Sequence, residues 1–201
     1  VGDVVNPQSV QQMQQRHPAL QVINGYGPTE NTTFSTTWAL GPVTADAGLP
    51  IGKPLPNRRC YVLNSQLQRV PVGVVGELYV AGAGLARGYL NRPALTEERF
   101  IANPFGAGRL YRTGDLVRYR AEGALEYLGR NDFQLKIRGY RIEAGEIEAA
   151  LQRCGAEVAL VSAQRDSAGH QVLVGYYQAA DLAVETLRQR LSQSLPAHLV
   201  P

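Results

Sequence analysis

The chain has 201 residues, 44% of them hydrophobic and 18% charged, which is typical of a globular protein and excludes disorder as the default state. Its formal net charge of +3 is too small to indicate a nucleic-acid or other polyanionic partner. The two cysteines lack metal-ligand or CxxC spacing and no apolar run approaches the roughly 18 residues of a membrane span, so we expect a reduced, cytoplasmic setting without a disulfide framework.

The first part of the chain is predicted to contain one helix followed by short strands. We expect the helix over Pro7–Leu20 and a short strand over Gln21–Ile23 that leads into a loop. From about residue 40 to residue 130, β-branched and aromatic runs alternate with Gly, Pro and Asn turns, which is typical of a small antiparallel sheet or barrel. The runs are Arg59–Leu63, Gly76–Ala81, Arg109–Arg112, Leu116–Arg120 and Leu125–Leu128. A tight hairpin is predicted at Ala121–Ala124, because Gly123 can adopt a positive φ.

After Gly129 the pattern changes to a compact α+β unit of about 70 residues. Its predicted elements are strands Gln134–Arg138, Glu157–Gln164 and Gln171–Gln178 and helices Ala144–Cys154 and Val184–Ser194. We therefore predict a first domain over residues 1–130 and a second over residues 131–201.

Four stretches combine residues that could carry chemistry. In Asn24–Glu30, Tyr26 offers a face for a base, Asn24 an amide, Thr29 a hydroxyl for phosphate and Glu30 a ligand for Mg²⁺, although a plain turn also explains the Gly and Pro. The glycines of Gly76–Tyr89 fall as GxGxxxG, which does not fit the dinucleotide-binding spacing and favours simple turns.

The other two stretches lie later in the chain. In the predicted turn Thr113-Gly114-Asp115, the carboxylate could accept hydrogen bonds from a ribose diol, or could simply partner the backbone of the turn. In Gln134–Arg138 the alternation places Lys136 and Arg138 on one solvent-facing side, which also suits a charged edge strand.

Taken in this order, the stretches resemble the core motifs of the adenylation domains of nonribosomal peptide synthetases, which are adenylate-forming enzymes. The matching segments read NGYGPTE, GELYVAGAGLARGYLNRPALTEERF, YRTGDL, GRNDFQLKIRGYRIEAGEIE and the terminal LPAHLVP. The resemblance covers the whole chain. It implies an α/β and α+β fold: the end of a large N-terminal domain with a small distorted β-barrel, a hinge, and a small α+β C-terminal subdomain.

The resemblance also implies ATP- and Mg²⁺-dependent activation of an amino acid or related carboxylic acid, followed by transfer to the phosphopantetheine thiol of a carrier protein. Its implied partners further include a condensation domain or an MbtH-like protein. By motif, Asn24, Tyr26 and Gly27 would hold the adenine, and Gly25 belongs to the same nucleotide-binding set. The catalytic residues would be Thr29 at the α-phosphate and Glu30 at Mg²⁺. Asp115 would bind the ribose hydroxyls, with Arg130 assisting at the ribose and phosphate.

The remaining implied roles concern the acid substrate and the second half-reaction. Gly25, Thr33 and Phe34 would line the acid pocket, with Val1 as a further candidate. Asp132 would be the hinge, and Lys136, Arg138 and Gly139 would approach the pantetheine arm.

The chain also departs from the complete pattern, and other functions stay open. It starts without Met, and the family's phosphate loop and catalytic lysine are expected upstream of Val1 and downstream of Pro201, so we expect these 201 residues to be inactive alone. An acyl- or aryl-CoA synthetase would use the same first step with free CoA as acceptor. A non-catalytic module gripping a polyanion through Lys136 and Arg138 would instead bind nucleic acid in a salt-dependent way.

Overall fold

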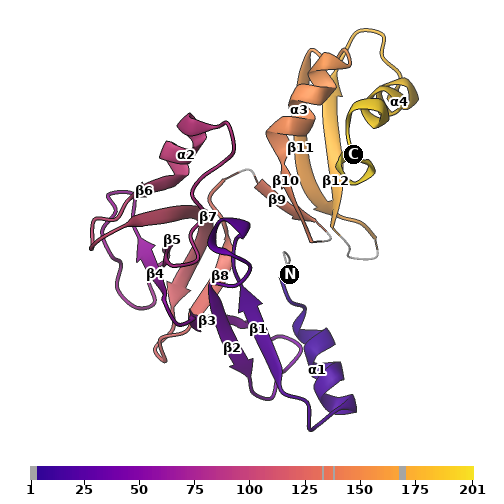
Figure 1. Cartoon of the computed structure of the whole chain (residues 1–201). Helices are drawn as coiled ribbons and strands as arrows, with labels where there is room; N and C mark the ends of the chain where they lie inside the picture. Colours follow the sequence, from indigo (N-terminus) through magenta and orange to yellow (C-terminus); the bar gives the residue numbers. More distant parts are fainter. Residues whose placement is uncertain (1–3, 133, 138, 168–170) are drawn as a thin grey trace. The chain divides into compact units, whose positions relative to one another are not determined.

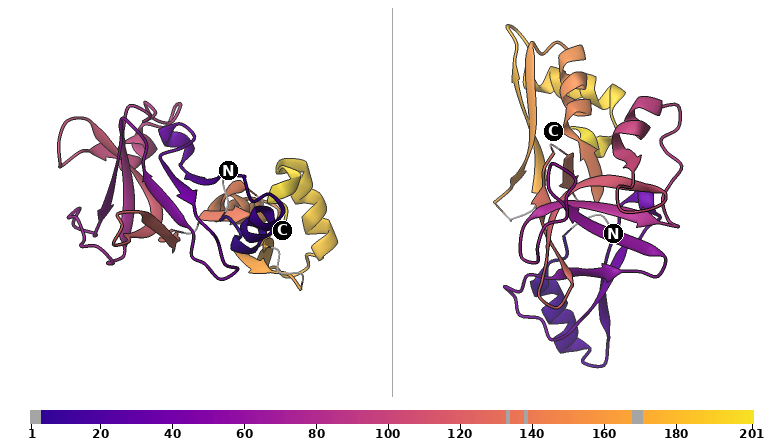
Figure 2. Two further views of the ribbon diagram at one scale, coloured as in Figure 1. Left: turned by 90° about the horizontal axis from the view of Figure 1, so that it is seen from below. Right: turned by 90° about the vertical axis from the view of Figure 1, so that its left-hand side faces the viewer.

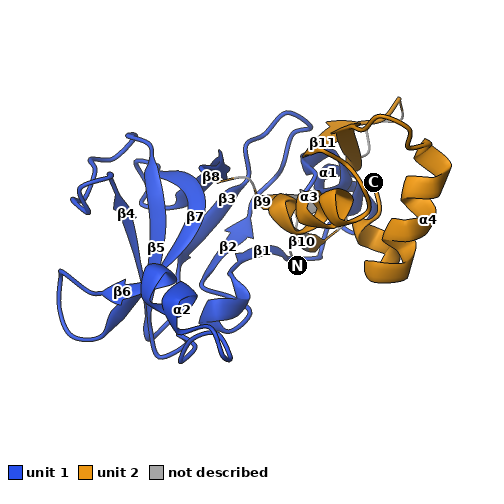
Figure 3. Ribbon diagram, turned by 90° about the horizontal axis from the view of Figure 1, so that it is seen from above, with its two compact units in different colours: residues 1, 3–131 blue, residues 2, 132–201 orange. Residues whose placement is uncertain are grey.

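The computed structural model describes residues 4–132, 134–137, 139–167 and 171–201, with the backbone alone at Lys136 and Arg141. The chain divides into two compact units between Asn131 and Asp132 (Figure 3). We call them unit 1, which ends at Asn131, and unit 2, which runs from Asp132 to Pro201. The division lies next to the boundary expected from the change of sequence pattern.

Unit 1 is built on an antiparallel sheet (Figure 1). Its elements are α1 (Pro7–Arg16), β1 (Val22–Tyr26), the 3₁₀ turn η1 (Thr29–Asn31), β2 (Thr36–Leu40), β3 (Pro50–Pro54), β4 (Arg58–Leu63), β5 (Gly76–Gly82), α2 (Pro93–Arg99), β6 (Phe100–Ala102), β7 (Arg109–Tyr119) and β8 (Leu125–Arg130). The strand order is β1-β2-β3-β8-β7-β5-β4, and β6 pairs with β7. In the described part of the chain the end strands β1 and β4 are not neighbours, so the expected barrel is not confirmed.

The core of unit 1 lies on both faces of β4, β5 and β7. Alternate side chains of these strands point to opposite faces. One cluster collects Val62, Leu78, Val80, Tyr111 and Val117, and the other collects Tyr61, Leu63, Tyr79, Ala81 and Leu110. Strand β5 is therefore buried on both sides, and it gives the site described below a rigid support.

Helix α1 begins as predicted but ends earlier. The Asn6 side chain accepts a hydrogen bond from the backbone N–H of Gln8, and Pro7 occupies the first turn. The prediction that the helix reaches Leu20 is wrong, because Pro18 disfavours helical geometry at His17.

Strand β7 corrects a second prediction. Two strands separated by a turn at residues 113–115 were expected, but one strand runs from Arg109 to Tyr119. The prediction for β1 was also short, since this strand continues to Tyr26 and carries part of the first motif.

The hairpin between β7 and β8 is confirmed. Gly123 has a φ of 78°, its N–H donates to Arg120 O over 2.9 Å, and Arg120 N–H donates to Ala124 O over 2.8 Å. Across the same hairpin, Glu126 accepts hydrogen bonds from Arg118 and Arg120 at 2.6 and 2.7 Å. Burial alone raises the pKa of Glu126, but the two arginines outweigh burial and lower it below its ordinary value.

Unit 2 is the compact α+β unit that the sequence pattern indicates. Its elements are β9 (Gln134–Ile137), β10 (Tyr140–Glu143), α3 (Ala144–Arg153), β11 (Val158–Arg165), β12 (Gln171–Gln178), α4 (Val184–Ser194) and the 3₁₀ turn η2 (Ala197–Leu199). The pairs β9–β10 and β11–β12 are antiparallel. Helices α3 and α4 lie on the same face of β11 and β12 (Figure 2, right), where Ile147, Leu151, Leu187 and Leu191 join the core. None of the helices in the described residues is long and apolar enough to cross a bilayer.

Candidate functional site

The site is centred on a bulge in β7. Glu77 pairs with Leu116 and Tyr79 pairs with Arg112, so the three residues Thr113–Asp115 lie opposite the single residue Leu78. Gly114 has a φ of 75°, in the left-handed region that glycine adopts without strain. The motif that reads as a turn in the sequence is therefore a bulge inside a continuous strand, and its last residue is Asp115.

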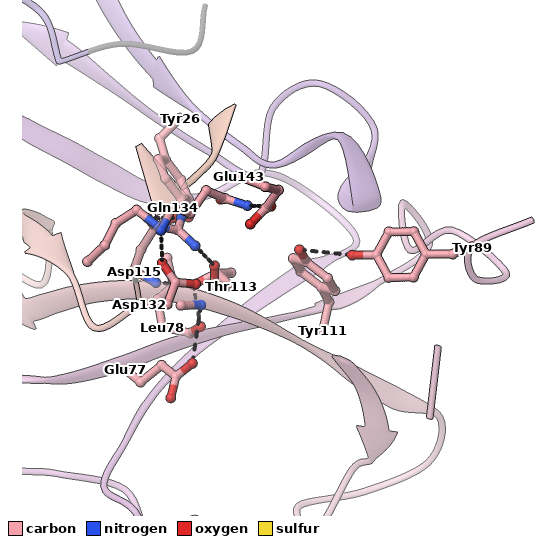
Figure 4. A network of polar contacts seen from close by, with 12 residues as sticks. Tyr26, Glu77, Leu78, Tyr89, Tyr111, Thr113, Asp115, Asp132, Gln134 and Glu143 are labelled. Carbon is pink, nitrogen blue, oxygen red and sulfur yellow. Dashed lines mark hydrogen bonds and ion pairs between the residues drawn. The ribbon is translucent and has the colours of Figure 1, made fainter. Parts of the chain in front are cut away.

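Side chains and neighbouring backbone satisfy the polar groups of this bulge. The Thr113 hydroxyl donates to Leu78 O over 2.6 Å and accepts from Asp115 N–H over 3.0 Å. Glu77 Oε1 accepts from Gly114 N–H over 3.1 Å, a contact drawn at Glu77 in Figure 4. The same oxygen also accepts from Arg112 Nε over 2.9 Å. The Glu77 carboxylate on β5 and the Thr113 hydroxyl in the bulge itself therefore hold the bulge in place.

The Asp115 carboxylate joins two distant parts of unit 1. The Tyr26 hydroxyl, on β1, donates to Asp115 Oδ2, and Arg130 Nη1, at the end of β8, donates to Asp115 Oδ1 over 2.8 Å. The side chains of Arg130 and Asp115 are 9% and 4% exposed. Burial raises the pKa of Tyr26 well above its ordinary value and the charge of Asp115 raises it further, so this hydroxyl stays a donor.

The first motif is split between strand β1 and the turn after it. Asn24 is buried, and its Nδ2 donates to Pro50 O over 2.7 Å, which ties β1 to β3. Gly27 leaves no room for a side chain, since a Cβ there would lie 2.5 Å from Thr33 O and 2.6 Å from Ser35 N. The motif glycine is therefore required by the close approach of two backbone segments.

Gly25 and Phe34 are brought together. A Cβ on Gly25 would lie 2.7 Å from Cε1 of the Phe34 ring, so the ring packs on the bare α-carbon. Thr33 is exposed on the preceding turn, and its φ of 58° belongs to the left-handed region. Val1, the further pocket candidate, lies outside the described residues.

Glu30 and Thr29 lie in η1, next to the Gly25–Phe34 contact. Glu30 is 7% exposed, and its Oε1 accepts from the Tyr89 hydroxyl over 2.6 Å. The Tyr89 and Tyr111 hydroxyls lie 3.4 Å apart (Figure 4). Burial raises the pKa of Tyr89 and the hydrogen bond to Glu30 raises it further, so Tyr89 also stays a donor. Thr29 is exposed at the start of the turn.

The described residues include no group of three or more His, Cys, Asp or Glu side chains able to hold a metal ion. Glu30 is the candidate oxygen ligand that the motif indicates. This suits Mg²⁺ delivered with a nucleotide, because that ion commonly takes one or two carboxylates and completes its shell with phosphate oxygens and water.

Sequence reasoning assigned no role to four residues that shape this site: Tyr89, Glu77, Thr113 and Arg58. Arg58 Nη1 donates to Asn31 O over 2.6 Å and to Asn31 Oδ1 over 2.9 Å, which braces the turn that carries Glu30. All but Arg58 fall inside stretches that the sequence singled out, so the motifs were the available signal. The residues that these four side chains contact are far away in the chain, so the sequence could not predict the contacts themselves.

Of the residues expected at the second half-reaction, Asp132, Lys136 and Gly139 lie in or beside the β9–β10 hairpin of unit 2. Asp132 Oδ1 accepts from Gln134 N–H over 3.2 Å, and Gly139, between the strands, has a φ of 82°. The backbone of Lys136 pairs with Arg141. Arg138 lies outside the described residues, as does the side chain of Lys136.

Comparisons with known proteins agree with the resemblance that the motifs indicate. Residues 1–90 match the family model described as AMP-binding enzyme. The whole chain is 46% identical over 204 residues to tyrocidine synthase 3 of Brevibacillus parabrevis, of which it covers 3%. It resembles NpsA-ThdA, an artificially fused adenylation–PCP di-domain NRPS from Klebsiella oxytoca, with 34% identity and a TM-score of 0.84 over the whole chain and 38% of that structure. Residues 1–90 are thus similar to AMP-binding enzymes, and the whole chain is similar to nonribosomal peptide synthetases.

Another relative of known structure in this comparison is a holo four-domain nonribosomal peptide synthetase bound to AMP and glycine. The chain is 40% identical to it, with a TM-score of 0.60 over the whole chain and 15% of that structure. These matches confirm the resemblance read from the motifs and the mixed α/β fold. The chain spans 3%, 38% and 15% of the length of these three relatives, which is well under half in each case.

Proposed function

We propose that the chain is part of the adenylation domain of a nonribosomal peptide synthetase. The domain activates an amino acid, or a related carboxylic acid, with ATP as an acyl-adenylate and releases pyrophosphate. It then transfers the acyl group to the phosphopantetheine thiol of a carrier protein. The AMP-binding family match and the adenylation–PCP relatives support this reaction and this partner.

The observation that carries the proposal is the meeting of Tyr26, Asp115 and Arg130. Each Asp115 oxygen already accepts one hydrogen bond, from Tyr26 or from Arg130. An ionised carboxylate has two acceptor oxygens and no donor of its own, which matches the two hydroxyls of a vicinal ribose diol. The two donors would hold the carboxylate oriented for a diol, and Arg130 would assist at the ribose and phosphate.

The rest of the nucleotide follows from the neighbouring motif. In this proposal Asn24, Tyr26 and Gly27 hold the adenine, and Gly25 belongs to the same nucleotide-binding segment. The Asn24 bond to Pro50 and the close packing at Gly27 would keep this segment in place. Thr29 contacts the α-phosphate, where its exposed hydroxyl can donate.

Glu30 would ligate the Mg²⁺ that accompanies ATP, with the Tyr89 hydroxyl fixing its other side. When bound, the ion would neutralise charge on the phosphate oxygens.

The acid pocket would include Gly25, Thr33 and Phe34. The Phe34 ring covers Gly25 and would make this wall of the pocket apolar and narrow.

The second half-reaction would use unit 2. Asp132 would be the hinge, because it is the first residue of unit 2 at the junction between the two compact units. Gly139 and the segment around Lys136 and Arg138 would approach the pantetheine arm, and the positive φ of Gly139 supports a close backbone approach. A condensation domain or an MbtH-like protein would be a further partner, in a cytoplasmic setting that suits two free cysteines.

The test uses the complete adenylation domain, because this chain covers only 38% of the adenylation–PCP relative. We expect Asp115→Asn to weaken ATP binding by roughly tenfold to a hundredfold, the effect of losing hydrogen bonds to a charged group. The matched control is Asp46→Asn, at an exposed loop position, which should bind ATP as the unchanged domain does.

Equal affinities for the Asp115 and Asp46 variants would refute the ribose assignment. Thiol transfer to free CoA in preference to a carrier protein would replace the proposal by an acyl-CoA synthetase. Amino-acid-dependent pyrophosphate exchange by residues 1–201 alone would contradict the expectation that they are inactive by themselves.

A further inference from the structure

We propose that Thr113 and Glu77 are positioning residues for ribose recognition, acting through Asp115. This inference rests on the proposed nucleotide function and adds two residues to it. Neither side chain is assigned a contact with the nucleotide. Their role would be to hold the β7 bulge in the one conformation that presents the Asp115 carboxylate to a ribose diol.

The argument starts from the hydrogen-bond requirement of a bulged strand. In a regular antiparallel pair, every second residue exchanges its N–H and C=O with the residue opposite. Three residues facing the single residue Leu78 break that exchange, and the region is buried, with Leu78, Thr113 and Asp115 at 0%, 2% and 3% exposure. Buried backbone groups in such a place require other partners.

Two side chains supply those partners for the N–H groups. Glu77 accepts from Gly114 N–H, and Thr113 accepts from Asp115 N–H while it donates to Leu78 O. Two carbonyl groups of the bulge accept hydrogen bonds from the end of β8 and the residue after it. Arg130 Nη2 donates to Thr113 O over 3.1 Å, and Asn131 N–H donates to Gly114 O over 3.0 Å. The N–H groups of residues 114 and 115 and the carbonyls of residues 113 and 114 therefore all have partners, and Figure 4 shows Glu77, Leu78, Thr113 and Asp115 gathered around them.

Glu77 fits this role because its charge is compensated outside the site. Arg112 Nε donates to the same Oε1 that receives Gly114 N–H, and the Arg112 side chain is 44% exposed against 10% for Glu77. The carboxylate therefore acts as a fixed acceptor for the bulge on the side of β5, whereas Asp115 is bonded from β1 and β8.

Thr113 provides the sharper experiment, since valine has nearly the same shape without the hydroxyl. Binding of ATP and of 2′,3′-dideoxy-ATP to the complete adenylation domain would be measured by calorimetry. The unchanged domain should prefer ATP by roughly tenfold or more, the contribution of hydrogen bonds from the diol to a carboxylate. Thr113→Val should lose most of this preference and keep its affinity for the dideoxy nucleotide, whereas Thr113→Ser, which retains a hydroxyl, should restore the preference.

Two further variants complete the design. Thr186→Val makes the same chemical change at an exposed position of α4 and should leave the preference intact. If Thr113→Val does not fold, as judged by its melting curve, the preference for ATP over the dideoxy nucleotide is measured instead in Glu77→Ala and Glu77→Gln, which change the acceptor on β5. The glutamine keeps an oxygen acceptor for Gly114 N–H and should keep more of the preference than the alanine.

The outcomes separate this inference from the proposed function. If the unchanged domain prefers ATP and folded Thr113→Val keeps the full preference, the positioning role is refuted and the ribose assignment stands. An equal loss of affinity for both nucleotides would also refute it, because that result indicates general damage. If the unchanged domain binds ATP without any preference, the Asp115 assignment fails and the inference fails with it.

Discussion

Replacing Arg130 by methionine tests whether the buried ion pair holds unit 1 together. The side chains of Arg130 and Asp115 are 9% and 4% exposed and their charged atoms lie 2.8 Å apart. Removing one partner of a buried pair leaves the other charge poorly compensated and typically costs about 3–5 kcal/mol. The Tyr26 hydroxyl would remain on Asp115 Oδ2, so we expect a loss near the lower end, about 3 kcal/mol.

The measurement is urea unfolding followed by the fluorescence of Trp38, the one tryptophan in the sequence. Trp38 lies in β2, so its signal reports on unit 1. The control is Arg118→Met, which breaks an ion pair of 2.6 Å whose arginine is 44% exposed. For such an exposed arginine we expect a loss of about 1 kcal/mol or less.

A second change makes the test sharper. In the double variant Arg130→Met with Asp115→Asn, the buried charge is removed together with its partner, and the asparagine oxygen can still accept from Tyr26. The double variant should therefore be more stable than Arg130→Met alone, by about 1 kcal/mol or more. The reasoning is wrong if Arg130→Met costs no more than Arg118→Met, or if the double variant is the less stable of the two.

Two more predictions concern stability. Gly27→Ala should cost about 1–3 kcal/mol in the same Trp38 assay, because its methyl group would collide with backbone atoms of residues 33–35, whereas Gly41→Ala, with open space around it, should change little; equal effects would contradict the packing argument. The pKa of Glu126 is lowered in the folded chain, so its contribution is present above its ordinary value of 4.5 and is lost as the pH falls. Glu126→Gln should therefore be destabilising near pH 7, and the gap to the unchanged chain should narrow below about pH 4.5; a gap that stays constant with pH would count against the ion pairs.

Features that depend on neighbouring residues were determined by the sequence alone. The hairpin at Gly123, the helix Val184–Ser194 and the strand Gln171–Gln178 are found where the pattern predicts them. Glycine at a tight reversal and apolar periodicity act over a few residues, so they can be read from the chain. The resemblance to adenylation domains could be recognised for a related reason, since the motifs that carry it are contiguous stretches of sequence.

The tertiary structure decided which of the motif residues meet. Tyr26 and Asp115 are 89 residues apart in the chain, and Glu30 and Tyr89 are 59 apart, yet each pair shares a hydrogen bond. Such contacts depend on the strand order and register of the whole sheet, which no local pattern specifies.

The bulge at Thr113–Asp115 shows the same limit most clearly. Its sequence reads as an ordinary glycine turn, and a turn was predicted there. It stays within one strand because Glu77, on the neighbouring strand, bonds the Gly114 N–H and the Thr113 hydroxyl reaches Leu78 O. The sequence alone determined that an aspartate follows a glycine at this place, and only strand pairing decided where its carboxylate lies.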